Sequence, residues 1–103
     1  MRVLMNLDEL VKRFDEISRM FGEWMVAPQL VIRARHDWST RDSRFYAMFE
    51  NVWISEGENG GAVASYGNGS TPEEAMQDYM RIINGKTLIL HINYENEKQV
   101  VVT

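Results

Sequence analysis

The 103-residue sequence has no cysteine, only two prolines and only two histidines. Without cysteine, disulfides, thiolate metal sites and cysteine nucleophiles are excluded. Zinc-protease HExxH motifs and the nucleophile elbow of hydrolases are also missing from the sequence. No apolar run approaches the roughly 20 residues of a membrane-spanning helix, and charges at Asp8 and Glu9 interrupt any signal-peptide core. We therefore expect a cytoplasmic protein without membrane partner, metal or cofactor, and not an enzyme.

The composition is that of an ordinary globular protein, with 45% hydrophobic and 25% charged residues. A chain of this length can bury a core of its own, so we expect a single domain over residues 1–103. The net charge of -4 argues against general nucleic-acid binding, although a local basic surface is compatible with it.

The most strongly specified stretch is a helix that begins after Thr71 and ends before Gly85. Thr71 is placed to cap the helix, with Glu74 reaching back toward it and Pro72 at the first helical position. Gly85 can adopt the left-handed conformation that ends a helix. Apolar residues recur between these boundaries at helical spacing, which predicts one buried face: Ala75, Met76, Tyr79, Met80 and Ile83.

A second helix is predicted from Asn6 to Gly22 and strands elsewhere. Asn6 and Glu9 form a capping pair, and Leu10, Phe14 and Ile17 lie on one helical face. Alternating or β-branched segments predict five strands: residues 30–37, 44–54, 62–66, 87–94 and 99–103. A change of phase at Glu50-Asn51 predicts a bulge. We expect an α+β fold in the order α-β-β-β-α-β-β, with an antiparallel sheet of four to five strands and the helices on one face.

Two further segments are candidate sites. Gly67-Asn68-Gly69-Ser70-Thr71, before a helix, could bind an anion through backbone N–H groups, but the ordinary interpretation is a glycine turn leading into a cap. His36 and Asp37 resemble a base and its orienting acid. Neighbours on a strand point to opposite faces, so we expect a surface histidine and assign no catalytic residue.

Arginine and aromatic residues concentrate between positions 33 and 46, in an otherwise acidic chain. Guanidinium groups beside aromatic rings suit contact with phosphate or with a protein interface. We predict a partner-binding surface formed by Arg33, Arg35, Trp38, Arg41 and Arg44. The alternative is a sheet face whose arginines pair with acidic residues of the first helix.

Two resemblances rest on the same region. Gly69, Thr71, Glu73, Glu74 and Ala75 match the helix start of HicB-type antitoxin domains, which this stretch resembles over residues 66–85. The chain departs from that pattern by opening with a long helix. Together with Phe49-Glu50-Asn51-Val52 and Gly85-Lys86-Thr87-Leu88, the stretch is also similar to small uncharacterised proteins of bacteriophages and prophages, over about half of the chain.

We therefore expect a non-enzymatic binding protein. The phage resemblance implies an accessory protein that inhibits a host target, such as an anti-CRISPR protein acting on a host protein or ribonucleoprotein complex. The alternatives are an antitoxin-like or nucleic-acid-binding module and a small-nucleotide sequestering protein. Val100-Val101-Val102 should be paired, because an open apolar edge invites aggregation. That pairing is expected within the monomer or across a homodimer.

Overall fold

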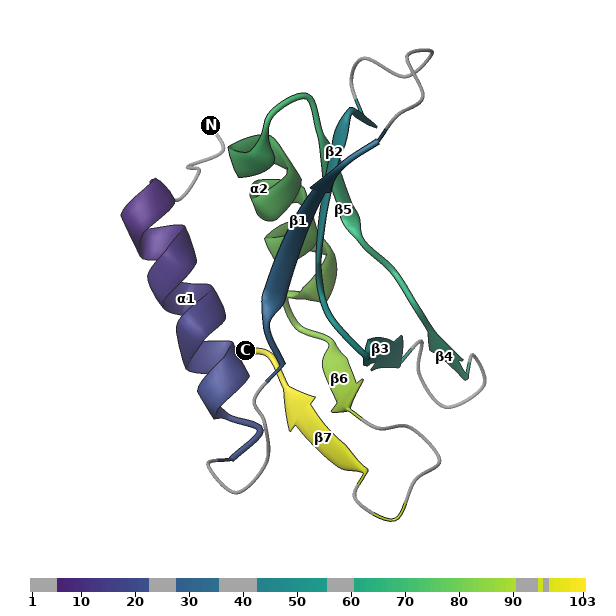
Figure 1. Cartoon of the computed structure of the whole chain (residues 1–103). Coiled ribbons are helices and arrows are strands. Elements are labelled where there is room, and N and C mark those ends of the chain that lie inside the picture. Colours follow the sequence, from purple (N-terminus) through teal and green to yellow (C-terminus); the bar gives the residue numbers. More distant parts are fainter. Residues whose placement is uncertain (1–5, 23–27, 36–42, 56–60, 91–94, 96) are drawn as a thin grey trace.

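The α+β class and both helices are confirmed by the computed structural model, which describes residues 6–22, 28–35, 43–55, 61–90, 95 and 97–103. The elements follow one another in the order shown in Figure 1: α1 (Leu7–Arg19), β1 (Leu30–Ala34), β2 (Phe45–Phe49), β3 (Val52–Ser55), β4 (Ala62–Val63), β5 (Gly67–Gly69), α2 (Pro72–Ile83), β6 (Thr87–Leu90) and β7 (Lys98–Val101). Neither helix in these ranges has the length and apolarity needed to cross a membrane.

The strands are antiparallel as expected, but they form two sheets rather than one, in the orders β1-β2-β5 and β4-β3-β6-β7. The division begins at Glu50-Asn51, where a turn replaces the predicted bulge. Asn51 adopts φ 61°, a left-handed conformation that asparagine tolerates better than most residues. The turn takes the chain from β2 of the three-stranded sheet into β3 of the four-stranded sheet. Between β4 and β5 the chain returns from the four-stranded sheet to the three-stranded sheet.

The segment Gly67–Gly69 is not the turn that its glycines predict but strand β5, which pairs with β2. Its glycines permit a close approach of α2. A Cβ atom at Gly67 would lie 2.2 Å from the Tyr79 backbone nitrogen, and one at Gly69 would lie 2.4 Å from the Ala75 nitrogen. The missing side chains therefore allow α2 to lie directly on β5.

Both predicted helix caps are present. The Glu9 N–H donates to Asn6 Oδ1 at 2.8 Å, and the Glu74 N–H donates to Thr71 Oγ1 at 3.1 Å. After α2, Gly85 has φ 78°, the left-handed conformation that ends the helix before β6 begins. The boundaries of both helices thus follow from local chemistry in the sequence.

The core lies between the helices and the inner faces of both sheets. Phe14 of α1, Phe49 of β2 and Tyr79 of α2 meet in its centre, with ring centroids 5.7 to 6.0 Å apart. At the C-terminus, β7 pairs with β6, and Val100 and Val102 are buried. The valine run is therefore paired within the monomer, which is the first of the two predicted alternatives.

Candidate functional site

Arginine and tyrosine side chains share the face of the β1-β2-β5 sheet that points away from α2. Phe45, Ala47 and Phe49 of β2 face the core. Strand alternation therefore turns Tyr46 to the opposite face, together with its cross-strand partner Arg33. We name five residues the arginine–tyrosine surface: Arg33, Arg35, Arg44, Tyr46 and Tyr66.

Arg35 lies at the centre of this surface. Its guanidinium carbon is 4.9 Å from the Tyr46 ring centroid and 5.1 Å from the Tyr66 ring centroid. The two rings are 5.6 Å apart and tilted by 59°. Arg35 Nη1 also donates a hydrogen bond to the Ser43 carbonyl, which fixes the guanidinium from a third direction. Two cation–π contacts and a main-chain bond hold the charge in place before any partner arrives.

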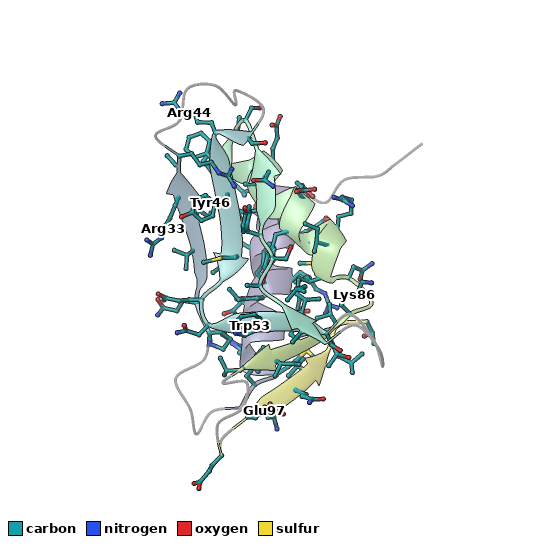
Figure 2. The ribbon with its side chains drawn as sticks, turned by 90° about the vertical axis from the view of Figure 1, so that its right-hand side faces the viewer. Arg33, Arg44, Tyr46, Trp53, Lys86 and Glu97 are labelled. Carbon is teal, nitrogen blue, oxygen red and sulfur yellow. The ribbon has the colours of Figure 1, made fainter. Side chains whose placement is uncertain are left out.

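Arg33 and Arg44 extend the positive charge around Arg35. Figure 2 shows Arg33 projecting away from the body of the protein beside Tyr46, with Arg44 at the end of the sheet. Both residues are exposed, and the Arg44 guanidinium carbon lies 5.6 Å from the Phe45 ring centroid. A fixed central guanidinium is thus flanked by exposed arginines.

The alternative, in which the arginines pair with acids of the first helix, does not hold for Arg33 and Arg35 among the described residues. Asp15 pairs with Arg19 at 3.0 Å and Glu16 with Arg13 at 3.6 Å, both within α1. In the described part of the chain, neither Arg33 nor Arg35 lies within ion-pair distance of a carboxylate. Their charges are therefore not neutralised by described acidic side chains.

The structure brings together part of the predicted set. Arg33, Arg35 and Arg44 share one region of the sheet, whereas Trp38 and Arg41, like His36, Asp37 and His91, lie outside the described residues. Tyr66 was missed as a site residue, although its side chain is 46% exposed. No local signal in the sequence indicated it, because its place beside Arg35 depends on the pairing of β5 with β2.

The glycine-rich segment before α2 does not offer an anion site. The Ser70 N–H donates to Glu74 Oε2 at 2.9 Å, and the Ser70 hydroxyl donates to the same oxygen. These bonds lower the pKa of Glu74 below its ordinary value of 4.5, with the hydroxyl bond the largest cause. The protein's own carboxylate thus occupies the donors that an anion would use. Across the described ranges, no group of three His, Asp or Glu side chains is placed to hold a metal ion.

A groove of about 470 Å³ lies on the other side of β1, between that strand and the helices. Its lining is mostly apolar and includes Val11 and Phe14 of α1, Leu30 of β1, Phe49 of β2 and Met76 of α2. Such a volume is within the range of ligand-binding sites. We name it the edge groove, because it borders the outer edge of the β1-β2-β5 sheet.

Comparison of the chain with protein-family models, with curated proteins and with solved structures gave no match.

Proposed function

We propose that this protein is a non-enzymatic binding protein whose contact surface is the arginine–tyrosine surface, extended by Trp38 and Arg41. One observation carries the proposal: Arg35 is held between Tyr46 and Tyr66, while no described carboxylate neutralises it or Arg33. Arginine and tyrosine are the residue types enriched at the energetic centres of interfaces. A prearranged guanidinium also loses less side-chain entropy when it binds.

The chemistry of the surface selects an acidic partner. A guanidinium presents several N–H donors in a plane and matches a carboxylate with two hydrogen bonds. Beside it, the exposed Tyr66 offers apolar contact area. A net charge of -4 on the whole chain disfavours a polyanion such as bulk RNA or DNA, which interacts with the entire molecule at long range. An acidic patch on a protein is therefore the favoured target.

The specific form that we propose is a phage accessory protein that inhibits a host defence system in the host cytoplasm, with a CRISPR effector complex as the example. The support is the resemblance of Phe49–Leu88 to small phage and prophage proteins, together with a compact binding surface. Occupying a target site requires affinity and shape only, which a domain of 103 residues supplies.

A nucleic-acid-binding function is the second candidate, because two tyrosines beside arginines on an open sheet face also suit base stacking. The two candidates differ in salt dependence. Binding to a phosphate backbone releases counterions and weakens steeply as salt rises, whereas a mixed apolar and ionic protein interface weakens less. Of the remaining alternatives, nucleotide sequestration requires a bound nucleotide that is released when the protein is denatured.

The experiment is a comparative capture from bacterial lysate. Wild-type protein and the double variant Arg33→Ala/Arg35→Ala are immobilised, and bound proteins and nucleic acids are quantified. Lys12→Ala/Arg19→Ala is the matched control, because it removes two exposed positive charges from α1. A protein retained by the wild type and the control but lost from the arginine variant supports the proposal. Equal retention by all three, or retention of nucleic acid alone, contradicts it.

A further inference from the structure

Among the described strands, none pairs with the outer edge of β1, which lies beside the edge groove. The Arg35 N–H donates to the Arg44 carbonyl at 2.7 Å, and the Glu50 N–H donates to the Gln29 carbonyl at 3.1 Å. These bonds place the odd-numbered residues of β1 in hydrogen-bonded pairs with β2. The even-numbered residues, Leu30, Ile32 and Ala34, therefore direct their N–H and C=O groups outward. Because β1 is first in its sheet, no described strand meets these groups.

Exposed apolar side chains surround this edge. Ile32 of β1 is 38% exposed, and Val11 of α1, on the other side of the groove, is 51% exposed. α1 runs alongside β1 (Figure 1) but packs against α2. The Ser18 hydroxyl, which donates to the Pro28 carbonyl at 2.7 Å, joins the end of α1 to the start of β1. A strand added to β1 would lie beneath α1 and would cover Ile32 and Val11 together.

The two faces of such a strand would meet different chemistry. Side chains on its inner face would enter the edge groove, against Phe14, Leu30 and Met76. Side chains on its outer face would lie opposite Arg33 and next to Arg35, which point to the other side of the sheet. The main-chain groups of Arg33 bond to β2. In an added antiparallel strand, the residue opposite Arg33 would therefore form a non-hydrogen-bonded pair with it, the kind of pair in which side chains approach most closely.

We infer that this edge binds an extended segment of a partner protein by strand addition, and that the segment alternates apolar with acidic residues. Main-chain hydrogen bonds to Leu30, Ile32 and Ala34 would supply affinity, while the groove and Arg33 would select the side chains. The inference rests on the proposed function, because it names the partner chemistry that the arginine–tyrosine surface recognises.

The test measures the affinity of a fluorescent octapeptide of alternating valine and glutamate, with blocked ends, by anisotropy. A peptide of alternating valine and lysine is the comparison. Each cross-strand pair of opposite charge contributes up to about fivefold in affinity. The affinity of the glutamate peptide should therefore be at least about tenfold higher than that of the lysine peptide. Arg33→Ala should reduce that preference.

Proline substitutions test the strand geometry. Ile32→Pro removes an outward N–H donor and leaves the β1–β2 bonds in place. The matched control is Val101→Pro. Val101 is 54% exposed on the edge strand β7, and its neighbour Val102 donates inward to the Lys86 carbonyl, so the Val101 N–H also points outward. Ile32→Pro should abolish peptide binding and Val101→Pro should not change it. If Ile32→Pro fails to fold, Ile32→Lys and Val101→Lys make the same comparison.

Several results would overturn the inference: absence of peptide binding, equal affinity for both peptides, or equal losses in the two proline variants. Light scattering that shows a dimer dissociated by Ile32→Pro would assign the edge to a second copy of the chain. Displacement of the peptide by single-stranded RNA would assign it to nucleic acid. Capture from lysate that depends on Arg33 and Arg35 but not on Ile32 would refute strand addition and leave the proposed function standing. Capture that depends on none of the three would refute the proposed function itself.

Discussion

The hydroxyl of Tyr79 accepts a hydrogen bond from the Phe49 N–H at 3.1 Å in the centre of the core. Phe49 is the last residue of β2, and β5 pairs with β2 only as far as Ala47. Beyond that point the Phe49 N–H has no strand partner, and a buried N–H without a partner is costly. Tyr79 supplies the acceptor where the two sheets separate.

Tyr79→Phe should therefore destabilise the fold by about 1 to 3 kcal/mol, because it leaves the buried N–H unsatisfied while keeping the ring. Urea unfolding of the variant and the wild type measures the difference. Tyr46→Phe is the control, since Tyr46 is half-buried outside the core. Equal stability of the wild type and Tyr79→Phe would show that the hydroxyl does not stabilise the division of the sheets.

The same tyrosine predicts a loss of stability at high pH. Burial raises the pKa of Tyr79 from 10.0 to about 12, because the phenolate is poorly solvated in the core. A raised pKa means that stability is fully present below pH 10 and is lost as the pH rises toward 12. The wild type should lose more stability than Tyr79→Phe across this interval. Parallel pH profiles for the two proteins would contradict the prediction.

Gly67→Ala should destabilise the protein by about 3 kcal/mol or more, because the new methyl group would collide with the backbone of α2. Gly61→Ala is a useful comparison. Gly61 has φ 69° and no atom lies near the position of a Cβ, so the alanine substitution there should cost only about 1 to 2 kcal/mol of stability through backbone strain. Thermal or urea unfolding ranks the two variants. A smaller effect at Gly67 than at Gly61 would argue against close packing of α2 on β5.

The Ser70–Glu74 contact predicts a pH-dependent contribution on the acid side. The pKa of Glu74 is lowered, so its stabilising effect is present above the ordinary value of 4.5 and is lost as the pH falls through the lowered pKa. Glu74→Gln should lower the melting temperature at neutral pH, and the difference from the wild type should shrink as the pH falls. A difference that is constant with pH would show that the charge of Glu74 is not involved.

Local chemistry made both helices predictable, because caps such as Asn6–Glu9 and Thr71–Glu74 act within four residues. The division into two sheets was not predictable in the same way. It depends on Asn51 adopting a left-handed conformation and on Tyr79 reaching Phe49, 30 residues away. Gly67–Gly69 was misinterpreted because glycine favours turns in isolation, whereas here contact with α2 determines its use.

The candidate site was predictable only where it depends on local strand geometry. Alternation along β1 correctly indicated that Arg33 and Arg35 share a face. The positions of Tyr66 beside Arg35 and of the edge groove beside β1 depend on tertiary packing between distant segments.

The affinity of the Arg33→Ala/Arg35→Ala variant for the purified partner, measured beside its thermal melting, tests the central claim most directly. Exposed Arg33 forms no ion pair among the described residues. The two cation–π contacts of the half-buried Arg35 contribute about 1 to 2 kcal/mol, so the variant should remain folded with a modestly lowered melting temperature. Its binding should weaken by about 2 kcal/mol or more, roughly thirtyfold, as expected for residues at the centre of an interface. Unchanged affinity together with a lowered melting temperature would show that these arginines stabilise the fold and do not bind the partner.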